Sequence, residues 1–186
     1  MTVTVNLYAG PGAGKSTSAA YLYYRLKSDG HNAELVREYI KNWAWEGRKV
    51  GRYDQMYILG KQIRGETLLL GQVSHMVTDS PLWLNAYYTE RYTPLVLGYG
   101  IRTAIQQYYR QQQDDGHVAH HVVLERTKPY VASGRYETER EARAADEGIV
   151  AVLEAEGVSF TRCCTNEAAL SDLYNRLIVK QEPYTR

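Results

Sequence analysis

Residues 3–17, which read VTVNLYAGPGAGKST, decide the fold of this chain. The first six of them alternate in the manner of a β-strand, and the next six are mostly glycine and proline, as in a loop. Apolar residues then recur at helical spacing until residues 28–30 end the helix, and residues 33–36 have the pattern of a second strand. Strand, loop, helix and strand in this order predict a right-handed βαβ unit, and therefore a parallel sheet.

The loop of this unit has the pattern of a phosphate-binding loop. Residues 9–17 match G-x-x-x-x-G-K-[S/T], with Ala9 in place of the first glycine. Glycines let backbone N–H groups turn inward around a phosphate, and the following helix directs its N-terminus at the same anion. The rival dinucleotide-binding pattern fails, because Lys15 stands where it requires a glycine. We therefore expect a bound nucleoside triphosphate with Mg²⁺.

The roles within this loop follow from their chemistry. Lys15 would neutralise the β- and γ-phosphate oxygens, Ser16 would bind Mg²⁺, and Thr17 could donate to the α-phosphate. The predicted nucleotide-binding residues are Gly10, Pro11, Gly12, Ala13, Gly14, Lys15, Ser16 and Thr17.

The rest of the chain continues to alternate strands with helices. Further strands are predicted at 74–79, 120–125 and 158–162, and helices at 39–47, 53–71, 82–92, 95–113, 138–157 and around 170–177. Within this pattern, Thr138 and Glu141 fit a capping box at the start of a helix. We expect one domain over residues 1–186, with a three-layer α/β/α P-loop NTPase fold and a five-stranded parallel sheet.

Composition is consistent with a single globular domain. The 186 residues are 44% apolar and 23% charged, and the net charge of +1 excludes a global basic field that would attract nucleic acid or membrane. Without an apolar run of about 18 residues or a signal-like start, the chain is expected to be soluble and cytoplasmic, with no membrane partner. Cys163 and Cys164 are adjacent, which favours two reduced thiols.

Two carboxylates follow predicted strands. Glu38 comes after the second strand and Asp79 after the third, and ligands of parallel sheets bind at the carboxyl ends of strands. One of them could accept the proton of an acceptor hydroxyl while the other holds Mg²⁺, for which Asp79 and Ser16 are the candidates. Alternatively, Glu38 is an ordinary acid at a helix N-terminus and Asp79 an N-cap.

The segment 126–137 has the composition of a lid. It contains Pro129, Gly134 and several cations, and a mobile cationic flap would exclude water and stabilise charge on a transferring phosphoryl group. Arg135 is the first candidate for a phosphate contact and Arg126 the second. Arg140 and Arg143 are better explained as solvated helix charges.

The class of P-loop protein follows partly by elimination. The sequence has no guanine-reading N-K-x-D segment after a strand, as a GTPase requires, and it lacks the length and the acidic pair typical of a motor ATPase. A kinase is therefore the favoured class, and a P-loop ATPase without kinase activity remains as another alternative.

Residues in chain order after the loop also carry a family resemblance. With Val36-Arg37-Glu38-Tyr39, Thr78-Asp79-Ser80-Pro81-Leu82 and Gly134-Arg135, the chain resembles phage-encoded P-loop kinases related to thymidylate and deoxynucleoside kinases. Among these it is similar to the kinases that phosphorylate 5-hydroxymethyluracil bases within phage DNA. The resemblance implies ATP as donor, Asp79 and Glu38 near the acceptor, and a phage-infected cell as the location. Dedicated deoxynucleoside kinases show D-R-S where this chain has Asp79-Ser80-Pro81, which argues against a free nucleoside as acceptor.

The acceptor is expected to bind to the helical segment of residues 39–115. More than half of the 17 tyrosines lie there, interleaved with lysines and arginines, whereas the whole chain has one phenylalanine. Rings and cations together suit a nucleotide or the backbone of DNA, but for any single ring core packing is the favoured explanation. A free nucleoside or nucleoside monophosphate is the alternative acceptor.

Overall fold

The computed structural model describes residues 1–51, 53–92, 95–127, 129–131, 133 and 137–178. The strands are β1 (Val3–Tyr8), β2 (Ala33–Val36), β3 (His75–Thr78), β4 (Val118–Glu125) and β5 (Thr161–Cys164). The helices are α1 (Lys15–Ser28), α2 (Lys41–Trp45), α3 (Asp54–Thr67), α4 (Trp83–Tyr92), α5 (Leu95–Asp114), α6 (Glu139–Ala155) and α7 (Glu167–Leu177).

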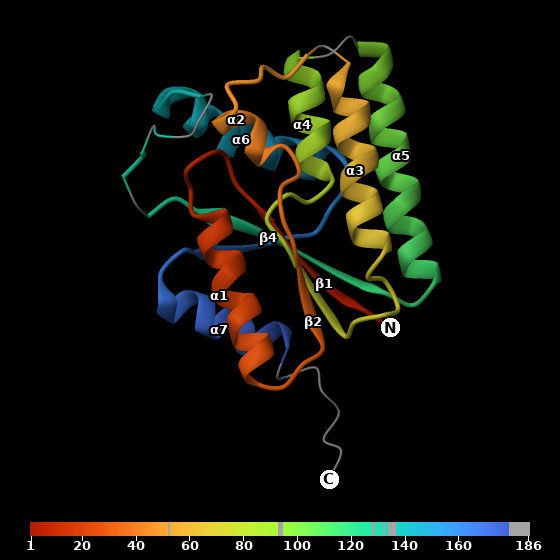
Figure 1. Cartoon of the computed structure of the whole chain (residues 1–186), viewed down its shortest axis with the longest axis vertical. Helices are drawn as coiled ribbons and strands as arrows, with labels where there is room; N and C mark the ends of the chain where they lie inside the picture. Colours follow the sequence, from red (N-terminus) through yellow and green to blue (C-terminus); the bar gives the residue numbers. More distant parts are fainter. Residues whose placement is uncertain (52, 93–94, 128, 132, 134–136, 179–186) are drawn as a thin grey trace.

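The five strands form one parallel sheet in the order β2-β3-β1-β4-β5. Helices α1 and α7 cover one face, and α3, α4, α5 and α6 cover the other (Figure 1). The predicted three-layer α/β/α arrangement is thereby confirmed. Strand β1 lies at the centre of the sheet, with β3 on one side and β4 on the other, so the loop that follows β1 lies at the middle of the edge formed by the carboxyl ends of the strands.

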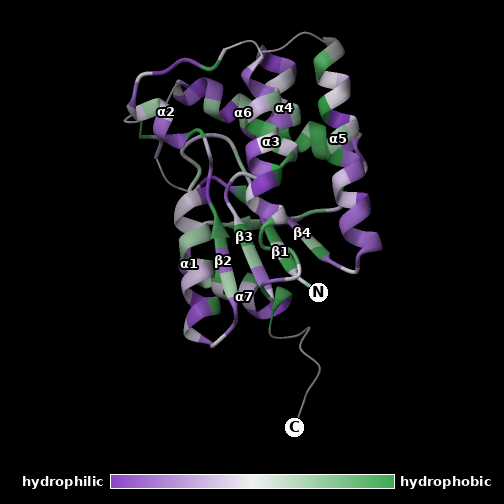
Figure 2. Cartoon of the chain, turned by 45° about the vertical axis from the view of Figure 1, so that its right-hand side comes forward, coloured by the Kyte–Doolittle hydropathy of each residue, from purple (hydrophilic) through white to green (hydrophobic). Residues whose placement is uncertain are grey.

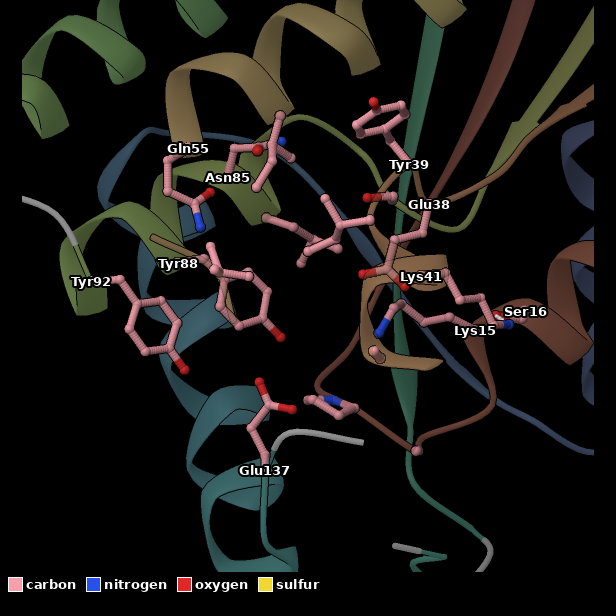
Figure 3. Close-up of a pocket in the computed structure, with 18 of the residues that line it drawn as sticks. Lys15, Ser16, Glu38, Tyr39, Lys41, Gln55, Asn85, Tyr88, Tyr92 and Glu137 are labelled. Atoms are coloured by element: carbon pink, nitrogen blue, oxygen red, sulfur yellow. Dashed lines mark hydrogen bonds between the residues drawn. The ribbon is translucent and has the colours of Figure 1, made fainter. Parts of the chain in front are cut away.

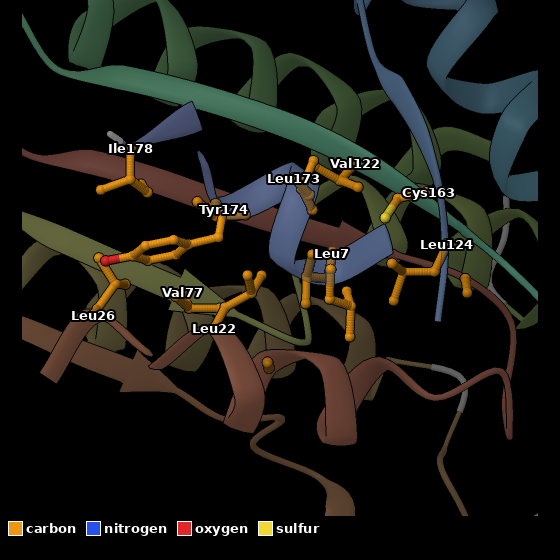
Figure 4. Packing of buried hydrophobic residues seen from close by; sticks show 14 of the residues in the cluster. Leu7, Leu22, Leu26, Val77, Val122, Leu124, Cys163, Leu173, Tyr174 and Ile178 are labelled. Atoms are coloured by element: carbon orange, nitrogen blue, oxygen red, sulfur yellow. The ribbon is translucent and has the colours of Figure 1, made fainter. Parts of the chain in front are cut away.

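Each face of the sheet packs an apolar layer. Leu7, Val77 and Val122 pack against Leu22 of α1 and Leu173 of α7 on one face (Figure 4). The other layer is formed mainly by residues of α4, α5 and α6, including Trp83, Ile101, Ile105, Ile149 and Leu153. Figure 2 shows the hydrophobic strands between helices whose outer surfaces are largely hydrophilic. In the described part of the chain, no helix is both long and apolar enough to span a membrane.

The last strand lies further along the chain than predicted. It spans Thr161–Cys164 instead of residues 158–162, because pairing with β4 begins only where Thr161 lies opposite Val122. The alternation that suggested an earlier strand has another cause: Val158 and Phe160 pack against the apolar layer beneath α4, α5 and α6. The predicted helix over 53–71 likewise ends earlier, at Thr67.

Two helix starts position the site. Helix α1 begins at Gly14, whose φ of 102° is left-handed, and no side chain caps it, so its first N–H groups face the loop. Helix α6 begins at Thr138 with the predicted capping box, in which Thr138 and Glu141 satisfy one another's backbone N–H groups. The site therefore lies between the N-terminus of α1, which no side chain caps, and the N-terminus of α6, which is capped by its own side chains.

Gly10 is expected to be essential to the contact between the loop and α6. A Cβ atom at Gly10 would overlap the Ala142 carbonyl oxygen, whereas one at Gly60 in α3 meets nothing within 4 Å. Gly10→Ala should therefore lower the free energy of unfolding by about 1–3 kcal/mol. The matched variant Gly60→Ala should raise it by up to about 1 kcal/mol. Urea denaturation of both variants tests this, and equal stabilities would contradict the packing described.

Candidate functional site

A pocket of about 440 Å³ opens beside the phosphate-binding loop. Figure 3 shows Lys15 and Ser16 at one end, Gln55, Asn85, Tyr88 and Tyr92 at the other, and Glu38 between them. The pocket therefore has one end suited to a triphosphate and one suited to a second molecule. It is lined by Pro11, Gly12, Gly14, Lys15, Ser16, Thr17, Glu38, Tyr39, Ile40, Lys41, Ala44, Lys49, Val50, Gln55, Ile58, Ser80, Leu84, Asn85, Tyr88, Tyr92 and Glu137.

The side chain of Lys15 folds back onto the phosphate-binding loop that precedes it. The Nζ atom of Lys15 donates to the Ala9 carbonyl oxygen at 2.6 Å and to the Gly10 carbonyl oxygen at 3.1 Å. The Nζ atom of Lys41 lies 3.4 Å from the Ser16 hydroxyl oxygen, which it reaches from α2. Two lysines thus stand where the charge of a bound triphosphate would fall, one on each side of Ser16. Most of the predicted nucleotide-binding residues line this end of the pocket.

An ion pair holds the loop from its outer side. Asp146 of α6 accepts a hydrogen bond from the Gly10 backbone N–H at 2.6 Å and pairs with Arg126 Nε at 3.0 Å. Arg126 in turn donates to the Pro11 carbonyl oxygen at 2.9 Å, and its side chain is only 6% exposed. Its remaining nitrogen, Nη1, is buried without a partner in the described chain, and it lies beside Gly12. Arg126 therefore supports the loop, while its predicted phosphate contact stays a prediction.

The structure brings the two predicted carboxylates together. Val36 and Thr78 are opposite each other in the sheet, so Glu38 and Asp79 leave neighbouring strands at the same edge. The Glu38 backbone N–H donates to Asp79 Oδ1 at 3.0 Å, and Asp79 is 4% exposed. Burial raises the pKa of the Glu38 carboxyl, and the nearby Lys15 partly opposes this. Glu38 is thus a partly desolvated carboxyl close to the loop lysine.

The lid segment is only partly described. Arg135 and Gly134 lie outside the described residues, so the predicted phosphate contact of Arg135 stays untested. Glu137 at the end of the segment was not predicted, yet it lines the pocket. Burial raises the pKa of its carboxyl, while Arg91 and Lys15 lower it. Tyr130 donates to the Glu137 carbonyl oxygen and packs its ring beside Gly12, which ties this segment to the loop.

Two side-chain amides at the far end of the pocket were also missed. Gln55 of α3 is 3% exposed and Asn85 of α4 is 4% exposed, and neither side chain bonds to any residue that the structure describes. Tyr88 lies beside them, and burial raises the pKa of its hydroxyl well above the usual value, so this hydroxyl stays neutral. Buried amides normally have partners, so these two are available to a ligand. The polar residue at position 55 on an otherwise buried helix face was a signal for this site.

An aromatic–cation surface, formed by Tyr39, Arg48, Tyr57 and Lys61 above the buried Trp43 ring, adjoins the pocket. The Tyr39 and Tyr57 hydroxyls are 2.7 Å apart, and both rings are more than one third exposed. Lys61 Nζ lies 5.6 and 5.4 Å from these two ring centres, and the Arg48 guanidinium lies 3.5 Å from the Trp43 ring centre. Tyr39 also lines the pocket, so the surface and the pocket are continuous.

The remaining aromatic rings divide between two roles. Trp83, Tyr8 and Tyr174 are almost completely buried, and Tyr109 stacks on Trp83 with an interplanar angle of 17°. Core packing therefore explains these rings, as the favoured interpretation of single rings predicted. The exposed rings of Tyr39, which precedes α2, and of Tyr57 in α3 are different, because Tyr39 lines the pocket and Tyr57 contacts Tyr39.

No model of a known protein family matches the chain, and no curated protein matches its sequence. Solved structures do match. A NadR protein in complex with NR aligns with 100% of this chain at a TM-score of 0.72 and 15% identity. The chain spans about half the length of that protein, 54%.

Two complete kinases also share the architecture. Thymidylate kinase from Ehrlichia chaffeensis aligns with 98% of this chain and 100% of its own, with a TM-score of 0.63 and 10% identity. Deoxyadenosine kinase from M. mycoides, with products dCMP and dCDP bound, aligns with 94% of this chain and 98% of its own, with a TM-score of 0.54 and 13% identity. At such identities the likeness defines the fold alone. The chain has the α/β P-loop fold that these nucleoside and nucleotide kinases share.

The ion pair behind the loop should contribute measurably to stability. Asp146→Asn leaves the buried Arg126 charge without a carboxylate, so the free energy of unfolding should fall by about 3 kcal/mol. Asp172→Asn breaks the exposed pair with Arg176 and should cost less than about 1 kcal/mol. Urea denaturation of the two variants compares these values, and equal losses would show that the buried pair has no special role.

Proposed function

We propose that this protein is an ATP-dependent kinase that transfers the γ-phosphoryl group to a hydroxyl of a nucleoside-type acceptor. One observation carries the proposal: the phosphate-binding loop, the Glu38 carboxyl group and two buried amides that have no partner among the described residues all line a single pocket, and Asp79 accepts from the Glu38 backbone N–H. A protein that only hydrolysed ATP would have no need of the second, amide-lined end. The shared fold of known nucleoside and nucleotide kinases is consistent with this function.

The donor end would bind ATP with Mg²⁺. Lys15 would leave the loop carbonyls to neutralise the β- and γ-phosphates, with N–H groups of residues 12–17 around them. Ser16 and Asp79 carry hard oxygen donors of the kind that Mg²⁺ prefers, and they are the proposed ligands. The metal ion, when bound, would offset the charge that develops on the transferring group. Arg126 and Arg135 remain the proposed phosphate contacts from the lid, residues 126–137.

The acceptor hydroxyl would lie beside Glu38. A carboxylate next to Lys15 is placed to accept the hydroxyl proton as the oxygen attacks the γ-phosphorus, after which ADP leaves. Asp79 would then hold Mg²⁺ and, through the Glu38 N–H, fix the backbone that carries the base. At the far end, Gln55 and Asn85 each offer one donor group and one acceptor atom, which suits the edge of a nucleobase.

The proposed acceptor is a 5-hydroxymethyluracil base in DNA. The aromatic–cation surface supports this choice, because exposed rings and cations beside the pocket suit the bases and phosphates that flank a nucleotide in a strand. The base would have to leave the helix stack to reach the pocket. A free nucleoside is the second candidate, since a pocket of about 440 Å³ has the size of a small-molecule site.

Labelled ATP tests the reaction. The label should enter an oligonucleotide that contains 5-hydroxymethyluracil, and the Lys15→Ala variant should transfer it at least about 100-fold more slowly, because the phosphate charge is no longer neutralised. The label should enter a free nucleoside instead if the second candidate is correct. Label found only in inorganic phosphate would exclude both kinase proposals.

The role of Gln55 can be tested separately. Gln55→Leu should raise the KM for the acceptor about tenfold, the value of one hydrogen bond of about 1.4 kcal/mol, and leave the KM for ATP unchanged. Gln107 is exposed on α5 and makes no contact with the pocket, so Gln107→Leu is the matched control. An unchanged acceptor KM in Gln55→Leu would place the base elsewhere.

The aromatic–cation surface distinguishes a strand from a free acceptor. The double variant Tyr57→Ala/Lys61→Ala removes one stacking ring and one cation, so it should raise the KM for the oligonucleotide at least about tenfold more than the KM for the free nucleoside. Tyr99→Ala removes a tyrosine that is 77% exposed on α5, outside this surface, and is the control. Equal effects on both acceptors would contradict a role in strand binding.

A further inference from the structure

A buried chain of hydrogen bonds lies directly beneath the site. Glu66 of α3 is 1% exposed, and its two carboxyl oxygens accept from the Tyr108 hydroxyl at 2.9 Å and from Gln62 Nε2 at 3.4 Å. Gln62 Nε2 also donates to the Thr78 hydroxyl oxygen at 3.3 Å. That same oxygen accepts from the Ser80 backbone N–H at 3.1 Å. The chain therefore runs from α5 through α3 to both residues that flank Asp79.

These contacts define how β3 ends at Asp79, the proposed Mg²⁺ ligand. Thr78 is the last residue of β3, and its hydroxyl holds the chain in a turn by binding the N–H two residues on. Asp79 lies inside this turn, with Oδ1 on the Glu38 N–H. A change in the orientation of Thr78 would therefore move Asp79 relative to Glu38 and to the loop.

The orientation of the Gln62 amide depends on Glu66. Both hydrogens of Nε2 are used, one toward Glu66 and one toward Thr78, so the acceptor on Glu66 fixes which end of the amide faces the strand. If the amide turned over, its oxygen would face Thr78, whose hydroxyl would then have to rotate and donate its proton to the amide instead of accepting from it. Glu66 thus determines the direction of the hydrogen bond at Thr78.

We propose that Gln62 and Glu66 are positioning residues for phosphoryl transfer, which hold the turn of residues 78–80 so that Asp79 faces Glu38 and the phosphate-binding loop. This inference rests on the proposed function for its effect on catalysis. Neither residue lines the pocket, so neither touches a substrate, and their effect is confined to the geometry of Asp79.

The arrangement does not require a charged Glu66. Burial raises the pKa of its carboxyl to about 7, and the other ionisable groups around it are Tyr108 and Tyr109 of α5 and Tyr8 of β1, none of which is cationic. The Tyr108 hydroxyl can donate to an ionised Glu66 or accept from a protonated one, while the other carboxyl oxygen continues to accept from Gln62. A glutamine at position 66 can make the same two hydrogen bonds, and a leucine can make neither.

The test combines kinetics with local hydrogen exchange in the intact protein. Gln62→Leu and Glu66→Leu should each lower kcat by about 10- to 100-fold and leave the KM for ATP within about twofold, because the reacting groups are misplaced but ATP binding is not. In both variants NMR should show faster hydrogen exchange of the backbone amides of Ser80 and Glu38. The backbone amides of Val5 and His75 should stay protected from exchange. Glu66→Gln should keep both kcat and amide protection near the wild-type values.

Three results would overturn the inference. The first is an unchanged kcat and unchanged exchange at Glu38 and Ser80 in Gln62→Leu. The second is an equal loss of protection at Val5 and His75, which would indicate a general loss of stability. The third is a Glu66→Gln variant as inactive as Glu66→Leu. If the wild-type protein transferred no phosphate to any acceptor, the proposed function would fail, but the exchange at Glu38 and Ser80 would still decide whether Gln62 and Glu66 position Asp79.

Discussion

The attachment of the phosphate-binding loop to α6 is the contact on which the site depends. A loop whose backbone N–H groups must face an anion cannot use them to hold itself in place, so it has to be fixed from outside. Asp146 and Arg126 do this, since one accepts from the Gly10 N–H and the other donates to the Pro11 carbonyl oxygen. Gly10 leaves room for α6 to approach, because a Cβ there would overlap its backbone. The loop is thus held by its outer polar groups while its inner surface stays available.

The second half of the site follows from the parallel sheet. In a parallel sheet the carboxyl ends of β1, β2 and β3 meet at one edge, so the residues that follow them become neighbours although they are far apart in sequence. The hydrogen bond between the Glu38 N–H and Asp79 converts this proximity into a fixed geometry. The amide-lined end is built differently, from the buried faces of α3 and α4, and its amides depend on how those helices pack. The two ends of the pocket are therefore set by different layers of the molecule.

This difference explains how much the sequence could predict. The strand–loop–helix start, the βαβ unit and the capping box at Thr138 are local patterns, and all three were correct. The carboxylates at strand ends were predictable because sheet topology places them whatever the helices do. Asp146, Gln55 and Asn85 were not found, since their roles depend on the rotation of a helix against its neighbours. The shift of β5 to Thr161 has a similar origin, because the register of an outer strand is set by its partner and by packing beneath it.

Helix α3 nevertheless carries a signal that sequence reasoning can use. Gln55, Gln62 and Glu66 are spaced by seven and four residues, so they share the buried face of this helix with Ile58 and Leu59. Polar groups on such a face cost free energy. Because burial raises the pKa of Glu66, the free energy of unfolding depends on pH. The contribution of Glu66 to stability is present below about pH 4.5 and is lost as the pH rises through about 7. A leucine would avoid this loss but could not orient Gln62. Polar residues at helical spacing within an apolar stripe therefore indicate where a fold gives up stability, and in this chain they mark both the amide-lined end of the pocket and the hydrogen bonds that reach Thr78 beside Asp79.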